Sequence, residues 1–159
     1  MNPEFIQHGL SEAWRKNNLV NLKLLGAISV ENSGLSLSRK GSRTIAGQFA
    51  HMHGVRGMWL QVAAPKKYPS FVKLPKEESK PEVIASALDH SAQMIEDLLM
   101  DAVMAGGKIK GTKFDVFSFL GYLISHEAHH RGNILLTLKV SGCPIEKDLS
   151  FGIWEWDKL

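Results

Sequence analysis

Cysteine is almost absent from this chain, since Cys143 is the only one among 159 residues. A single thiol excludes an internal disulfide and a cysteine-rich zinc site, so any metal would have to be held by histidines and carboxylates. The sequence also lacks a run of about 18 to 20 uncharged apolar residues, which a membrane-spanning helix needs. It begins with MNPEFIQHGL, which has neither the basic segment nor the apolar stretch of a secretory signal. These absences predict a cytoplasmic protein with no membrane partner.

A strong charge of one sign is absent as well. The 19 Lys+Arg and 16 Asp+Glu residues leave a net charge of 19 − 16 = +3, and the two signs alternate through most of the chain. We therefore expect no nucleic-acid partner. Apolar residues make up 44% and charged residues 22% of the chain, which is typical of an ordinary globular protein. The length is enough for one buried core, so we expect a single domain over 1–159.

Four segments carry the apolar spacing of amphipathic helices, separated by a Gly/Ser-rich stretch at 29–42 and a Pro/Lys-rich stretch at 65–81. They run from about 4 to 28, from 43 to 64, from a Ser79-Pro81-Glu82 capping pattern to Gly106-Gly107, and from Thr112 to Gly142. Together they predict an all-α fold, a four-helix bundle. The aromatic C-terminal segment should pack back on this bundle through Ile153, Trp154 or Trp156.

The chain contains seven histidines. His126 and His130 are four residues apart on the last predicted helix, so they lie one turn apart on nearly the same face. Two imidazoles in this arrangement can bind one divalent ion. If the face points into the bundle, they need either hydrogen-bond partners or a metal.

A third ligand would have to come from another helix, and the second helix offers His51 and His53. Val55, Met58 and Val62 fall within about 40° of His51 on a helical wheel, which predicts that His51 lies on the buried stripe. His53 lies roughly 200° away, on the side of Arg56, which should be less buried. We therefore expect His51 to be the inward ligand and His53 to lie at the rim, with His53 as the next choice.

The remaining histidines have simpler interpretations. His8 and His90 are predicted to lie on helix surfaces. His129 is turned about 100° from His130, so it should be solvated or support the ligands from outside. Arg131 should have a structural role.

Three imidazoles would leave coordination positions open, which is typical of a catalytic rather than a structural metal site. A metal with open positions can lower the pKa of a bound water or thiol. Imidazole ligands favour zinc or nickel here, with iron or manganese as further options. No catalytic side chain can be assigned from these patterns.

Two segments of the sequence resemble the DinB superfamily, which includes the YfiT-like proteins. They are SHEAHHRGNI on the last helix and TIAGQFAHMHGVRGMWL on the second. The first matches the family pattern H-x-x-x-H-R-G-[QN] at His126, His130, Arg131, Gly132 and Asn133, where Asn stands in place of the more common Gln. The second places a histidine, His51, eight residues before Trp59.

The resemblance implies a DinB/YfiT-like four-helix bundle that is often dimeric and holds a divalent metal through a histidine triad, here His51, His126 and His130. Family members with known activity use low-molecular-weight thiols such as bacillithiol, mycothiol or glutathione. The resemblance therefore implies a metal-dependent thiol S-transferase or a hydrolase acting on a small-molecule substrate. Because Cys143 follows the end of the last helix, any reacting thiol should arrive with the substrate.

Two other functions remain open at this point. Residues 126–130 formally match H-E-x-x-H, the zinc-protease pattern in which Glu127 would be the general base. The residues expected further along a metzincin helix are missing, because Asn133 and Leu136 stand in their places. In a bundle, Glu127 would only flank the histidines. The second alternative is a non-enzymatic bundle that binds a metal or a partner protein.

Overall fold

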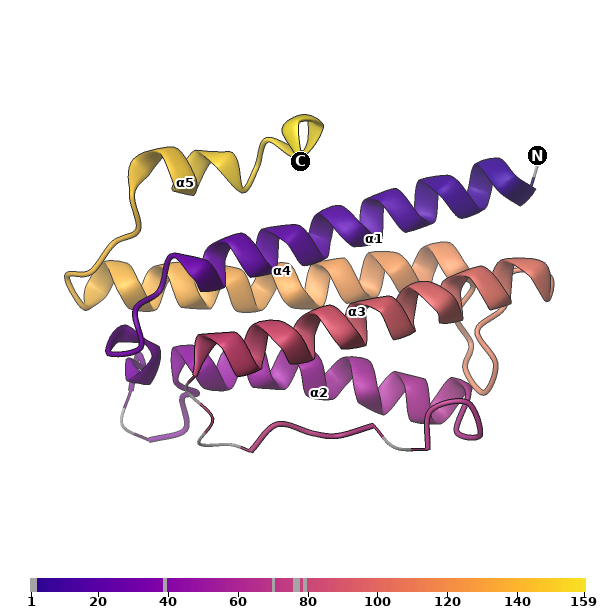
Figure 1. The fold of residues 1–159 in the computed structure, drawn as a ribbon, viewed down its shortest axis with the longest axis horizontal. Coiled ribbons are helices and arrows are strands. Elements are labelled where there is room, and N and C mark those ends of the chain that lie inside the picture. Colours follow the sequence, from indigo (N-terminus) through magenta and orange to yellow (C-terminus); the bar gives the residue numbers. More distant parts are fainter. Residues whose placement is uncertain (1–2, 39, 70, 76–77, 79) are drawn as a thin grey trace.

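The computed structural model describes residues 3–38, 40–69, 71–75, 78 and 80–159, and its long elements are all helices (Figure 1). The four long helices are α1 (Pro3–Gly26), α2 (Ile45–Ala63), α3 (Pro81–Met104) and α4 (Val116–Val140). The short ones are η1 (Asn32–Gly34), α5 (Lys147–Gly152) and η2 (Trp156–Lys158). No strand occurs within these described ranges, where β pairing is limited to the bridge between Lys108 and Asp115. The predicted all-α fold with four long helices is confirmed.

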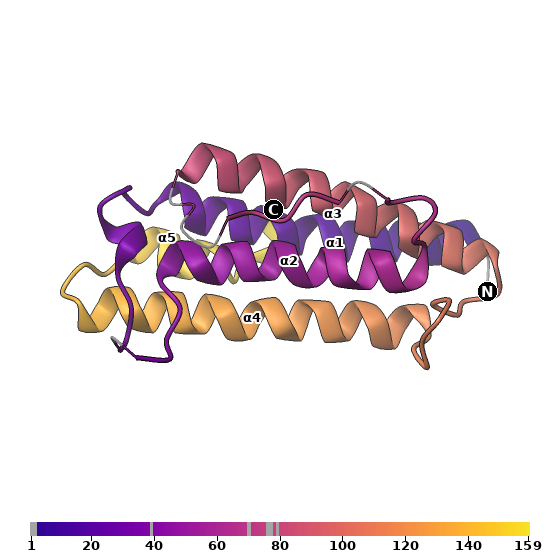
Figure 2. The same cartoon turned by 90° about the horizontal axis from the view of Figure 1, so that it is seen from below.

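The four long helices form a bundle in which α2 and α3 run in one direction and α1 and α4 in the other (Figure 1). Each of α1 and α2 packs against both α3 and α4. Because α2 and α3 run the same way, the connection between them must return along the whole bundle. Figure 2 shows its described residues running back lengthwise along the outer side of α2 and α3. This long crossover is the Pro/Lys-rich stretch of the sequence.

Capping side chains explain where two of the helices begin. The Thr44 hydroxyl accepts a hydrogen bond from Gly47 N at 3.0 Å, and the Asp115 carboxylate accepts one from Ser118 N at 2.8 Å. Each satisfies an amide that the first helical turn leaves without a backbone partner. At the start of α3, Pro81 occupies the first turn, but Ser79 of the predicted capping box lies outside the described residues.

The end of α3 depends on two glycines. Gly106 and Gly107 have φ values of 94° and 81°, which side chains other than glycine's rarely adopt. Gly107 N donates to the Ala102 carbonyl at 2.7 Å, which satisfies a carbonyl at the helix end. The predicted helix stop at this pair is therefore confirmed.

The core consists of two apolar clusters along the bundle. The larger cluster includes Trp14, Leu60, Ile95, Leu99, Phe119 and Leu123. The second includes Leu24, Ile45, Phe49, Leu88, Ile134 and Leu138. Every long helix contributes to both clusters, so the four helices are packed together along most of their length.

The C-terminal segment packs back on the bundle, as the sequence predicts. Ile153 is buried, and Lys16 Nζ on α1 donates to the Trp156 carbonyl at 2.6 Å. Trp154 is 75% exposed, so it is not one of the anchoring side chains. None of the helices described here is both long and apolar enough to cross a membrane.

The crossover connection is attached to the bundle at Phe71. The Phe71 ring stacks on His53 with ring centroids 4.6 Å apart, and it lies directly over Gly57 of α2. A Cβ atom at Gly57 would overlap the ring, so only glycine permits this approach. The Tyr68 hydroxyl adds a second attachment by donating to the Met94 carbonyl at 3.1 Å.

Gly57→Ala should lower the free energy of unfolding by about 1–3 kcal/mol, because the added methyl group displaces the Phe71 ring. Gly54→Ala on the same helix is the matched control, since no atom lies within 4 Å of a Cβ built there. It should stabilise the protein by about 0.5–1 kcal/mol through helix propensity. Urea denaturation of both variants measures the difference, and equal stabilities would contradict the proposed attachment.

Candidate metal centre

Three histidines from two helices meet at the junction of α2 and α4. They are His51 of α2 and His126 and His130 of α4, and their candidate ligand atoms all lie within 4.8 Å of one another. The Nε2 atoms of His126 and His130 are 3.2 Å apart. His51 is half-buried, with its ring centroid 5.3 Å from that of His126 and 4.8 Å from that of His130. We call these three residues the histidine cluster.

The donor atoms of the cluster fit a divalent metal. Two imidazole nitrogens bound to one ion at about 2.0–2.1 Å are separated by roughly 3.0–3.4 Å, and the observed Nε2–Nε2 distance of 3.2 Å lies in this range. The Nδ1 atom of His126 is buried without a hydrogen-bond partner among the described residues. Its Nε2 atom lies within hydrogen-bond distance of Nε2 of His130, so a bound ion would replace this contact between the two imidazoles.

Gln48 determines the tautomer of His130. Its side-chain oxygen Oε1 forms a short hydrogen bond with Nδ1 of His130, and an amide oxygen can only accept. Nδ1 therefore carries the hydrogen, which leaves the lone pair of a neutral imidazole on Nε2, the atom next to His126. A hydrogen bond of this kind commonly orients histidines that bind metals.

The environment keeps all three imidazoles neutral at pH 7. Burial, together with the nearby His126 and His51, lowers the pKa of His130 to about 4. Burial and then the charge of Arg43 lower the pKa of His51. Burial also lowers the pKa of His126, although the Glu127 carboxylate opposes this effect. Neutral imidazoles have the free lone pairs that a metal ion requires.

The structure brings His51 to the cluster, but the predicted reason is wrong. Met58 and Val62 are 44% and 45% exposed, so the stripe that carries His51 is not buried. The opposite side of α2 is the buried one, since His53 is 3% and Arg56 0% exposed. The helical wheel assumed that polar residues mark the exposed side of the helix. Here His53 and Arg56 are buried because Val72 and Glu127, far away in the chain, satisfy their hydrogen bonds.

The prediction that His53 lies at the rim is wrong, because this side chain is buried. It lies under the crossover connection, where its Nε2 is 2.8 Å from the Val72 carbonyl oxygen. The other predictions for single histidines agree with the structure. His8, His90 and His129 are exposed, and Asn133 Nδ2 donates to His129 Nε2 at 3.1 Å.

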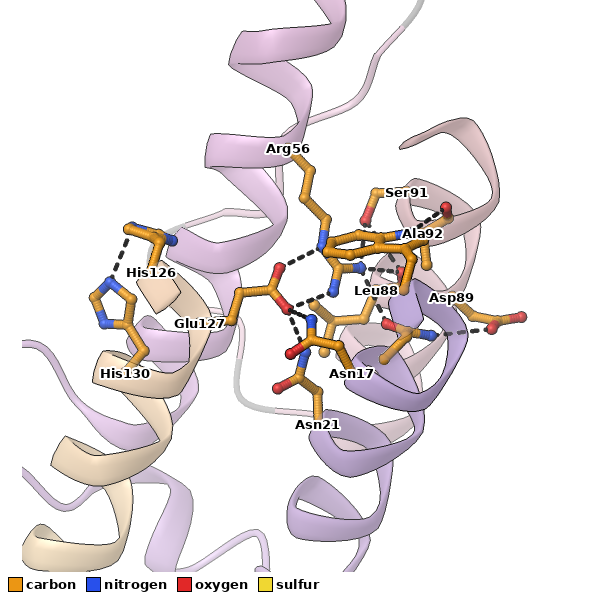
Figure 3. A network of polar contacts seen from close by, with 12 residues as sticks. Asn17, Asn21, Arg56, Leu88, Asp89, Ser91, Ala92, His126, Glu127 and His130 are labelled. Carbon is orange, nitrogen blue, oxygen red and sulfur yellow. Dashed lines mark hydrogen bonds and ion pairs between the residues drawn. The ribbon is translucent and has the colours of Figure 1, made fainter. Parts of the chain in front are cut away.

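Glu127 is not the flanking residue that the sequence predicts, because it is fully buried at the centre of a polar network (Figure 3). Arg56 donates to both carboxylate oxygens, through Nε at 2.7 Å and Nη2 at 3.0 Å. Asn17 and Asn21 of α1 also donate to Oε2, at 2.6 and 2.7 Å. Arg131 supports them by donating to their side-chain oxygens at 2.9 and 2.8 Å, which agrees with its predicted structural role.

These contacts keep Glu127 ionised inside the protein. Burial alone would raise its pKa, but the charge of Arg56 and the hydrogen bonds from the two asparagines bring the pKa below its ordinary value. Figure 3 shows the carboxylate pointing away from His126 and His130. A zinc protease needs this glutamate beside the metal as a general base, so the geometry does not match that function.

Sequence reasoning missed this network because its members are far apart in the chain. A signal was present in Asn17 and Asn21, which are four residues apart and so share a face of α1 with apolar neighbours. That pattern indicates buried amides, but it does not identify their partners.

The fold and the cluster define a class of protein, namely helical bundles with three histidines at the junction between two helices. The chain belongs to the DinB family, whose family model matches residues 6–148. No curated protein and no solved structure was found to match the chain.

Glu127→Ala should cost about 3–5 kcal/mol of folding free energy, because it leaves Arg56 buried without its counter-charge. Glu96→Ala is the comparison variant, since it breaks the partly exposed ion pair with Arg15, worth about 1 kcal/mol or less. Thermal and urea unfolding measure both values. Similar losses for the two variants would show that the buried network is not the dominant polar contribution.

Proposed function

We propose that the protein is a metal-dependent enzyme in which His51, His126 and His130 hold one divalent ion. The observation that carries this proposal is the convergence of three neutral imidazoles from two helices within 4.8 Å of one another. Three protein ligands leave at least one position for a substrate or water. Zinc or nickel suits the imidazole donors best, and iron or manganese is also compatible.

We propose thiol S-transfer as the reaction. A bound divalent ion would lower the pKa of a thiol or water, so that the nucleophile is present at neutral pH. In the transfer, the thiol sulfur forms a bond to the carbon of an electrophile while the bond from that carbon to its leaving group breaks. The leaving group takes the bonding electron pair, and the thiol proton passes to it or to solvent.

Two features of the chain support a thiol as co-substrate. Arg43 is exposed just before α2 and exerts its positive charge on all three histidines, so it favours an anion such as a thiolate. The protein's own thiol, Cys143, lies beyond the end of α4 and packs against the apolar cluster around Leu24 and Phe49. The reacting thiol would therefore be a small molecule such as bacillithiol, mycothiol or glutathione.

The metal content of purified protein tests the ligand assignment. Wild type should carry about one divalent ion per chain by elemental analysis, whereas His126→Ala and His130→Ala should lose it, since each removes a ligand nitrogen. His129→Ala is the matched control on the same helix and should retain the metal. His51→Ala and His53→Ala separate the two candidates on α2, and full metal content in His51→Ala would show that His51 is not a ligand.

The metal-loaded protein should consume glutathione, bacillithiol or mycothiol in the presence of a soluble alkyl or aryl halide. Removing the metal with a chelator should abolish the reaction, and adding the metal back should restore it, because thiol activation depends on the ion. Thiol loss and thioether formation can be followed by mass spectrometry. A protein that binds stoichiometric metal but transfers none of these thiols would favour a non-enzymatic metal-binding bundle.

A further inference from the structure

Three aromatic side chains lie together next to the histidine cluster. Trp59 of α2, Tyr122 of α4 and Phe114, which precedes α4, are each partly buried, and we call them the aromatic wall. Their ring centroids are 5.6 Å apart for Trp59 and Tyr122, 5.6 Å for Phe114 and Tyr122, and 5.7 Å for Trp59 and Phe114. Distances of this size are typical of mutually packed rings.

The aromatic wall is continuous with the histidine cluster. Tyr122 is one helical turn before His126, and its ring lies 6.1 Å from the imidazole at an interplanar angle of 23°. The fully buried Phe119 packs against Trp59 and Phe114. Phe119 therefore packs behind the wall in the core, and the three wall side chains stay partly exposed to solvent.

Resting on the proposed function, we propose that the aromatic wall binds a neutral, planar, apolar group of the substrate while the reacting atom reaches the histidine cluster. The substrate class would then be aromatic or similarly flat electrophiles, and Trp59, Tyr122 and Phe114 would determine specificity.

The charges around the wall favour a neutral group over a cation. Aromatic faces attract cations in general. Here, however, Arg43 acts on the neighbouring histidines, and a divalent ion would add two more positive charges. A carboxylate would lose most of its hydration against the faces of these rings, and the indole N–H of Trp59, which is buried without a hydrogen-bond partner among the described residues, would replace only part of it. A flat uncharged ring has no strong hydration to lose. It can stack on the faces of the partly exposed rings or contact their edges.

Three primary alkyl thiols of similar acidity test the proposal on the metal-loaded protein: 2-phenylethanethiol, 2-cyclohexylethanethiol and ethanethiol. Calorimetric titration gives the dissociation constant of each. The phenyl compound should bind about 10- to 30-fold more tightly than ethanethiol, and more tightly than the cyclohexyl compound. Equal binding of the phenyl compound and ethanethiol would overturn the proposal.

Variants locate the effect on the wall. Trp59→Leu and Tyr122→Leu keep an apolar side chain but remove a ring, so each should reduce the phenyl preference to about threefold or less. Trp154→Leu is the matched control, because this tryptophan is exposed near the C-terminus, and it should leave the preference unchanged. A preference that survives both wall substitutions would overturn the assignment.

A metal-independent measurement separates this inference from the proposed function. The indole Nε1–H resonance of Trp59 should shift when 2-phenylethanol is added to wild-type protein, with or without metal. Its assignment comes from its loss in Trp59→Leu. A chain that binds no metal would refute the proposed function, and a shift in that chain would still support an aromatic-binding site. If the resonance does not shift in the wild-type protein, the proposal that the aromatic wall binds aromatic groups is overturned, whatever the metal content.

Discussion

The buried contact between Glu127 and Arg56 is the interaction on which the rest of the structure depends. A carboxylate and a guanidinium inside a protein are tolerated only when their hydrogen-bonding capacity is filled. Here Asn17 and Asn21 of α1 donate further hydrogen bonds to the Glu127 carboxylate. Arg56 also donates to the Leu88 carbonyl of α3 at 2.7 Å. Four helices therefore meet at one ion pair, and the apolar clusters pack on either side of it.

This ion pair also determines which side chains are left for function. Neighbouring residues in a helix are about 100° apart, so when Glu127 points into the core, His126 is turned toward the outer edge of α4. Arg56 has the same effect on α2, because its burial places His51 on the outward side. The histidine cluster thus forms at an accessible junction, although its residues come from helices that also supply the core.

Along the junction of α2 and α4, the side chains change from aromatic at one end, through the three histidines, to polar and cationic at the other end. The aromatic wall of Trp59, Tyr122 and Phe114 lies toward the end of α2 and the start of α4, next to His126. Gln48 and Arg43 lie toward the start of α2 and act on His130. A site with an apolar end, an imidazole centre and a cationic end suits a reaction between an apolar electrophile and an anionic thiol, which is the proposed function.

The sequence alone determined the helices and the pairing of His126 with His130, because caps, glycine stops and the four-residue spacing act within a few turns of chain. It also favoured His51 over His53, which agrees with the histidine cluster, but the helical-wheel argument behind that choice was wrong. A helical wheel gives relative angles, whereas the buried side depends on partners elsewhere, here Glu127 for Arg56 and Val72 for His53. Only the tertiary structure could show that the buried side of α2 includes Gln48, His53 and Arg56. Buried charges are stable only where distant residues satisfy their hydrogen bonds.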